Sequence, residues 1–70
     1  MRPLSAKELI AILLANGFIL CRQKGSHQIY RNTVTGTIVP VPLHGMNKPI
    51  PIGTFLAIVK QSKISKEQFE

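Results

Sequence analysis

The apolar residues near the start of the chain follow the period of an α-helix. They recur at i, i+3 and i+4, at positions Leu9, Ile12 and Leu13. Ser5 and Glu8 have the spacing of a capping box, in which each side chain accepts a hydrogen bond from a backbone N–H of the first turn. Asn16 and Gly17 end the pattern, because glycine readily takes the left-handed conformation that closes a helix. We therefore predict a helix between Ser5 and Asn16.

After Gly17 the pattern changes to short runs rich in β-branched and aromatic residues, which are typical of β-strands. We predict three strands, at residues 18–23, 27–31 and 37–42. Turn-forming residues separate them, at 24–26 and 32–36. Pro40 and Pro42 lie two residues apart, so the N–H groups that they lack would lie on the same edge of the third strand. That strand should therefore form an edge of the sheet.

The helical period returns near the end of the chain. Gly53 and Thr54 open a second predicted helix after a proline-containing loop. Its predicted buried stripe consists of Phe55, Ile58 and Val59, helped by Leu56. Ser65 is expected to cap a last helical turn over residues 65–70. The predicted order of elements is therefore α-β-β-β-α.

This order fits an α+β fold of two layers, in which two helices cover one face of a three-stranded antiparallel sheet. Residues 1–70 are predicted to form a single domain. The other face of the sheet is left to meet solvent or a partner. Alternation along the second strand places His27, Ile29 and Arg31 on one face and Gln28 and Tyr30 on the other.

The charge of the chain points to a binding partner. Its 70 residues include nine Lys and Arg against three acidic residues, which gives a net charge of +6. No acidic residue occurs between Leu9 and Lys66. We predict a polyanionic partner, either a nucleic acid or an acidic protein. The lack of carboxylates in this span excludes a two-metal nuclease site or a glycosidase carboxylate pair there.

The single cysteine and the short apolar runs limit cofactors and location. Cys21 can form neither an intramolecular disulfide nor a cysteine zinc site by itself. We interpret it as a buried structural residue, and we expect no metal and no cofactor. A reducing, cytoplasmic location is the simplest interpretation. No apolar run approaches the roughly 20 residues of a membrane span, so no membrane association is expected.

Gly25, Ser26 and His27 carry the candidate chemistry. Glycine allows a phosphate to approach the backbone, and the serine hydroxyl can donate to a phosphate oxygen. A neutral imidazole can remove the proton of an RNA 2′-hydroxyl, so His27 could start cleavage without a metal. The alternative is an ordinary hairpin turn with a half-buried histidine. His44 is either a second proton donor, an RNA contact or a loop histidine with a structural role.

Basic and aromatic residues complete the predicted RNA-binding site. The cations that would hold an RNA backbone are Arg22, Lys24, Arg31 and Lys48. Cations close to His27 would also stabilise the charge that builds on the phosphorus oxygens during cleavage. Tyr30 is placed either to stack on a base or to pack within the protein.

Four stretches of the chain together carry a family resemblance. They are NGF at 16–18, RQKGSH with IY following at 22–30, VPVPLH at 39–44 and GTFLAIVKQ at 53–61. In order, spacing and length they resemble the HicA family, the toxin half of bacterial HicAB toxin–antitoxin modules. Members of that family often end the second helix with glycine, where this chain has Lys63. A left-handed backbone at a non-glycine residue there would cost about 1 kcal/mol.

The resemblance implies a fold similar to double-stranded RNA-binding domains and an mRNA interferase activity that is independent of the ribosome. It also implies that His27 is the catalytic residue and that a HicB-like antitoxin binds the toxin and blocks its site. We expect a monomer that assembles further only with the antitoxin. Two other functions stay open: a non-catalytic RNA-binding module of the same fold, and a protein-interaction domain whose basic face meets an acidic partner.

Overall fold

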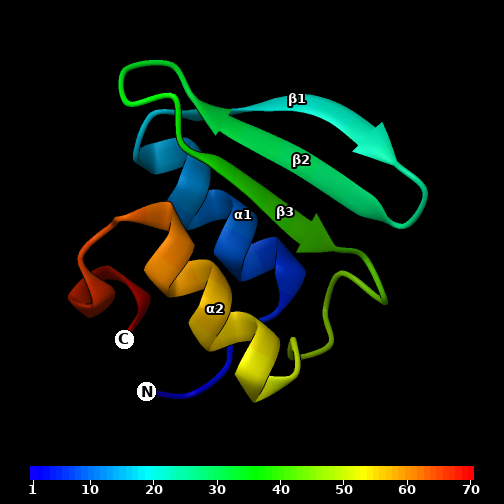
Figure 1. Ribbon diagram of the computed structural model, residues 1–70. Helices are drawn as coiled ribbons and strands as arrows, with labels where there is room; N and C mark the ends of the chain where they lie inside the picture. Colours follow the sequence, from blue (N-terminus) through cyan, green and yellow to red (C-terminus); the bar gives the residue numbers. More distant parts are fainter.

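The elements follow one another in the predicted order α-β-β-β-α in the computed structural model, which describes residues 1–70. They are α1 (Ala6–Ala15), β1 (Phe18–Lys24), β2 (His27–Asn32), β3 (Ile38–Pro42) and α2 (Ile52–Ser62), followed by a short 3-10 helix, η1 (Lys66–Phe69). The strands form one antiparallel sheet in the order β1-β2-β3, and both α-helices lie on the same side of it (Figure 1). The predicted two-layer α+β fold is confirmed. Neither helix is long and apolar enough to cross a membrane.

The start of α1 is encoded by residues close in sequence. Ser5 Oγ accepts a hydrogen bond from the Glu8 backbone N–H at 3.2 Å, and Glu8 Oε1 accepts one from the Ser5 N–H at 3.1 Å. The predicted capping box is therefore present. The bond from the Ser5 backbone, with a further contribution from Arg2, holds the pKa of Glu8 below its ordinary value of 4.5. Gly17 ends the helix with a φ of 87°, in the left-handed region.

The core lies between the helices and the sheet. Its largest fully buried side chains come from both layers: Leu9, Leu13, Phe18, Val39, Val41, Phe55 and Phe69. The rings of Phe55 and Phe69 meet edge to face, with centroids 6.2 Å apart, so η1 closes the core against α2. Leu56, which the helical stripe predicts to be buried, is 47% exposed because it lies on the side of α2 that the sheet does not cover.

The strands lie within one residue of their predicted bounds, but β1 has an irregularity that the pattern did not indicate. The pairing of β1 with β2 shifts between Leu20 and Arg22, which is the signature of a β-bulge at Cys21. Cys21 is exposed, so the prediction of a buried cysteine is wrong. The physical reason is that Phe18 is the only residue of β1 that is buried, while the rest of the strand is exposed.

β3 is an edge strand, as its prolines predict. Just past the strand, the Leu43 N–H donates to the Ser26 carbonyl on the side of β2, at 2.7 Å. Backbone N–H groups alternate between the two edges of a strand, so the donors that Pro40 and Pro42 lack would point away from β2. The outer edge of β3 therefore lacks two hydrogen-bond donors.

The ends of α2 differ from those of α1. The helix begins at Ile52, one residue before the predicted Gly53, and Pro51 at its N-cap offers no side-chain hydrogen bond. It ends at Lys63, whose φ of 61° makes it the one non-glycine residue with positive φ. The left-handed backbone considered from the sequence is thus present at Lys63. The prediction that Ser65 caps the last turn is wrong, because its hydroxyl donates to the Glu67 carboxylate at 2.7 Å instead.

Candidate active site at the end of the sheet

His27 begins β2 at one end of the sheet. Its neighbours in the strand register are Lys24 on β1 and Pro42 on β3. The imidazole is exposed, because alternation along β2 turns it away from the core in which Tyr30 is buried. This exposure differs from the alternative interpretation of the sequence, in which an ordinary hairpin turn holds a half-buried histidine.

His44 lies beside His27, although the two are far apart in sequence. Their ring centroids are 6.4 Å apart, and the ring planes are nearly perpendicular at 85°. The hydrogen bond from Leu43 to Ser26 continues the β2–β3 pairing past Pro42 and so brings the two histidines together. Both rings are exposed to solvent. The structure therefore joins two candidate residues that the sequence offered only separately.

Backbone hydrogen bonds to the N-terminal part of the chain fix the loop that carries His44. The Lys7 N–H donates to the Met46 carbonyl at 3.0 Å, and the Ile50 N–H donates to the Leu4 carbonyl at 2.9 Å. Ile50 is itself buried in the core. His44 is thus held on a loop anchored to α1 and to the segment before it.

Lys48 lies on the same loop and borders a small recess together with His44. Gly45 turns the chain between them with a φ of 108°, and a Cβ at this position would lie 3.2 Å from the Lys48 side chain. The recess has a volume of about 20 Å³, which is room for about one water molecule. A nucleotide would therefore have to lie across the open surface and not inside this recess.

Gly25 and Ser26 form the tight turn that connects β1 to β2. Gly25 has a φ of 59°, a left-handed conformation that glycine adopts without steric cost. A Cβ there would meet no atom within 4 Å, so the turn conformation is what requires glycine, and the space beside the backbone is open. The Ser26 carbonyl accepts the bond from Leu43, while the residue as a whole is exposed.

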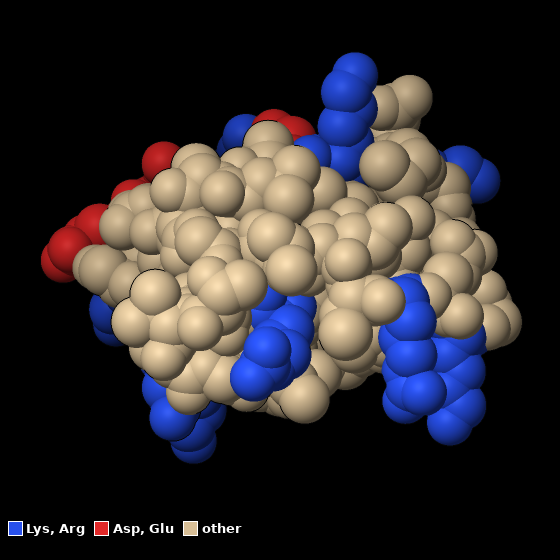
Figure 2. All heavy atoms as spheres, turned by 90° about the horizontal axis from the view of Figure 1, so that it is seen from above, with Lys and Arg blue, Asp and Glu red and all other residues tan.

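Arg22 and Arg31 continue the positive charge along the face of the sheet that the helices do not cover. Arg22 is aligned with Ile29 of β2, and Arg31 is aligned with Ile19 of β1. Both arginines are exposed, and neither is in an ion pair, because the one salt bridge joins Arg2 to Glu8. Figure 2 shows cationic groups in several places around an uncharged surface, with the acidic groups confined to one side.

Tyr30 does not belong to this surface. It is 4% exposed, and its hydroxyl donates to Gln28 Oε1 at 2.8 Å. Burial raises the pKa of its hydroxyl above the ordinary value of 10.0. The structure therefore supports packing over base stacking. Strand alternation places Tyr30 and His27 on opposite faces of β2, so the sequence pattern already indicated that Tyr30 would lie away from the histidine.

The arrangement can perform one kind of chemistry well. An imidazole can act as a general base or as a general acid, and this surface holds two imidazoles side by side, with no acidic residue between Leu9 and Lys66. Lys24 adds a positive charge beside His27. What sequence reasoning missed is the proximity of the two histidines, which follows from strand register and from the path of the loop.

The fold and the site thus define a small basic α+β domain with an exposed histidine pair at one end of its sheet. The model of the family described as HicA toxin of bacterial toxin–antitoxin matches residues 6–64. Because this match spans most of the chain, from α1 to just beyond α2, the chain belongs to the HicA toxin family. Membership identifies it as the toxin of a pair that includes an antitoxin. The comparison with curated proteins gives no match.

Proposed function

We propose that this protein cleaves mRNA in the cytoplasm, independently of the ribosome, by proton transfer through histidines, and that a HicB-like antitoxin inhibits it. The observation that supports this proposal is the pair of exposed imidazoles, His27 and His44, with centroids 6.4 Å apart on a cationic surface. The two rings are close enough for one phosphodiester to reach both. RNA supplies its own nucleophile, so this chemistry needs no metal.

In the proposed reaction, the neutral ring of His27 accepts the proton of a ribose 2′-hydroxyl. The 2′-oxygen then attacks the adjacent phosphorus, and the bond from phosphorus to the 5′-oxygen breaks. His44 in its protonated form donates a proton to that leaving oxygen. The products are one strand with a 2′,3′-cyclic phosphate and one with a free 5′-hydroxyl. Each turnover leaves the two histidines with their protonation states exchanged, and water restores them.

The cations have a separate role in this proposal. Lys24 lies beside His27 and would stabilise the negative charge that builds on the phosphorus oxygens in the transition state. The open backbone at Gly25 leaves room for the phosphate to approach. Arg22, Arg31 and Lys48 would hold neighbouring phosphates, which positions the strand without selecting a sequence.

The first experiment incubates the purified protein with a defined mRNA in EDTA, without ribosomes. The wild type should cut the RNA, and His27→Ala should lose about 10²- to 10⁴-fold in rate, the usual contribution of proton transfer. Lys7→Ala, an exposed change on α1, is the matched control and should cut normally. Both variants should melt at the wild-type temperature.

Two results would count against this assignment. If His27→Ala cuts as fast as the wild type, His27 is not the catalytic residue. If the wild type shifts the RNA on a gel but leaves it intact, the alternative of a non-catalytic RNA-binding module holds, and a steep dependence of binding on salt should accompany it.

The role of His44 can be tested with an RNA that has sulfur in place of the 5′-oxygen at the cleaved bond. A thiolate leaves without needing a proton, so this substrate does not require a general acid. His44→Ala should be slow on normal RNA and regain most of its rate on the sulfur substrate, whereas His27→Ala should stay slow on both. A His44→Ala variant that is equally impaired on both substrates would make His44 an RNA contact.

The same mechanism fixes the pH dependence of cleavage. The wild type should show a bell-shaped rate profile, because one histidine must be neutral and the other protonated. On the sulfur substrate His44→Ala should lose the fall in rate at high pH and keep the fall at low pH. Added antitoxin should stop cleavage by the wild type, because an antitoxin bound over this end of the sheet would keep RNA away from His27.

A further inference from the structure

The two histidines of the chain lie side by side, which makes them a candidate pair of ligands for a metal ion. Imidazole nitrogen is a common ligand of Zn²⁺ in proteins. Both rings are exposed, so an ion from solvent can reach them without opening the fold. His27 and His44 belong to different segments, so one ion bound to both would link β2 to the loop after β3.

The backbone fixes the two segments that carry these rings. Pro42 of β3 is aligned with His27, and the Leu43 N–H donates to the Ser26 carbonyl at 2.7 Å. The chain therefore reaches His44 directly from a paired strand. The loop beyond His44 is bonded in turn to the N-terminal part of the chain. Because both segments are already in place, one ion can bind both rings with little ordering of the backbone.

The separation of the rings is close to what a shared ion requires. A ring nitrogen lies about 2.0–2.1 Å from zinc, which places the ring centroid about 3.2 Å from the ion. Two rings on one ion then have centroids about 5 Å apart at a tetrahedral angle and about 6 Å apart at wide angles. The 6.4 Å between His27 and His44 exceeds the tetrahedral value by about 1 Å. Rotation of the two exposed side chains can close this gap without moving the backbone.

Such an ion would have two protein ligands, with water in its other positions. Cys21 is exposed, but it lies at the bulge in the middle of β1, whereas His27 is aligned with Lys24 at the end of that strand. The structure holds no group of three or more His, Cys, Asp or Glu side chains placed to bind one ion. The charge of Lys24 also repels a cation. Structural zinc sites have four protein ligands, so this pair would hold its ion weakly and exchange it.

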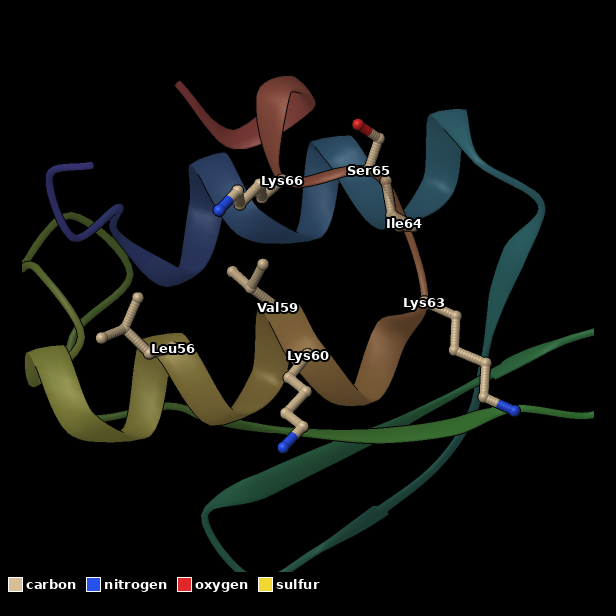
Figure 3. A pocket seen from close by; sticks show the side chains of 7 residues that line it. All are labelled: Leu56, Val59, Lys60, Lys63, Ile64, Ser65 and Lys66. Carbon is tan, nitrogen blue, oxygen red and sulfur yellow. The ribbon is translucent and has the colours of Figure 1, made fainter.

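The hollows of the protein surface offer no comparable set of nitrogen ligands. The largest, a groove of about 420 Å³ between α2 and the segment that leads to η1, is lined by aliphatic side chains, Ser65 and three lysines (Figure 3). A second hollow is bordered by the carboxylates of Glu8 and Glu70. Glu8, however, already accepts hydrogen bonds from Arg2 and Ser5. Zinc held by the protein should therefore be lost when a histidine is removed.

We propose that His27 and His44 together bind Zn²⁺ and that the bound ion reversibly inhibits the protein. A neutral imidazole that binds zinc through one nitrogen carries hydrogen on the other, so it has no lone pair left to accept a proton. His27 could then not take the proton of a 2′-hydroxyl, and the ion would also stand where the phosphate must approach. Zinc binding depends only on the two rings, whereas the inhibition rests on the proposed function.

The first measurement is zinc binding by calorimetry, without RNA or EDTA and with any purification tag removed. The wild type should bind one zinc ion per chain. His44→Ala should weaken binding at least about tenfold, since losing even an outer-sphere partner of a metal ligand costs that much. Cys21→Ser and Glu70→Gln are the matched controls, because each removes an exposed alternative ligand, and both should bind as the wild type does. Thermal melting checks that all three variants are folded.

A variant with the opposite effect sharpens the location of the site. Lys24→Gln removes the positive charge beside His27 and should tighten zinc binding by up to about fivefold, the usual range for one exposed charge pair. High salt should tighten zinc binding to the wild type and so reduce this difference. In NMR spectra of the wild type, zinc should shift the ring protons of both histidines together. Shifts at one histidine alone would contradict a shared ion.

Inhibition is measured in the cleavage assay, with EDTA left out. Zinc at several times the measured dissociation constant should stop cleavage by the wild type, and EDTA added afterwards should restore it. Mg²⁺ at the same concentration is the control, because it prefers oxygen ligands and should leave the rate unchanged. A sample without protein corrects for any cleavage of RNA by zinc itself.

Three results would overturn the proposal: no zinc binding by the wild type, equal zinc affinity in the wild type and His44→Ala, or unchanged cleavage when zinc occupies both histidines. If the wild type cuts no RNA even in EDTA, the proposed function fails and the inhibition falls with it. Calorimetry and NMR spectra would still decide whether the histidine pair binds zinc.

Discussion

The two faces of the sheet are built from alternate residues of the same three strands, yet most of their residues differ in burial and in charge. The inner face is part of the core, and its buried residues are Phe18, Tyr30, Asn32, Val39 and Val41. On the outer face His27, Arg31 and Ile38 are exposed. Apolar burial determines which residues the inner face accepts, because each contributes to stability in proportion to its hidden area. The outer face has little such constraint and can carry charge and chemistry.

This difference explains why residue type alone misleads. Tyr30 and His27 lie close in sequence, and both have a chemistry suited to RNA. The face of the strand separates them, since one ring is buried and the other is exposed. A candidate residue on a strand has to be assigned to a face before it is assigned a role.

The largest change in the free energy of unfolding is expected for a substitution on the inner face. Phe18→Ala should lower the free energy of unfolding by about 3–5 kcal/mol, the usual cost of removing a buried aromatic ring. Ile19→Ala, the next residue and 52% exposed, should change it by less than about 1 kcal/mol. Urea unfolding of the two variants measures the contrast directly. Equal losses would show that the outer face is also part of the stable core.

An intermediate effect on the free energy of unfolding is expected at Tyr30. Tyr30→Phe removes the hydrogen bond to Gln28 and should cost about 1 kcal/mol at neutral pH, with no change in RNA affinity. Burial raises the pKa of Tyr30 above 10.0, so the fold favours the neutral hydroxyl. Its contribution is complete below that pH and is lost as the pH rises through the folded-state pKa. Thermal melts at neutral and alkaline pH should show that Tyr30→Phe lacks this alkaline loss.

The smallest effect on stability is expected for an outer-face cation. Arg31→Ala should leave the free energy of unfolding within about 0.5 kcal/mol of the wild type. It should weaken RNA binding similarly for all sequences and lower the slope of log affinity against log salt by about 1. Fluorescence titration at several salt concentrations measures this slope. An unchanged slope would remove Arg31 from the RNA-binding surface.

The features that the sequence predicted well depend on neighbours along the chain. The Ser5–Glu8 capping box, the stop at Gly17 and the edge position of β3 all follow from spacings of a few residues. The left-handed backbone at Lys63 was considered because family members often have glycine at that place, and the structure shows this backbone conformation.

The features that were missed depend on residues far apart in sequence. The proximity of His44 to His27 requires the β2–β3 register and a loop held by bonds to the N-terminal segment. Phe69 enters the core only because η1 returns to α2. The bulge at Cys21 is a property of pairing between two strands, and no spacing within β1 reveals it.

The prolines of β3 leave the sheet with only one edge, that of β1, at which a further strand can pair fully. A strand from another chain can pair with the free edge of β1, but the outer edge of β3 lacks the two donors that Pro40 and Pro42 would have supplied. Two copies joined through β1 would form a six-stranded sheet with a proline-bearing strand at each end. Edge-to-edge assembly of this fold would therefore stop at two chains and could not continue into a fibre.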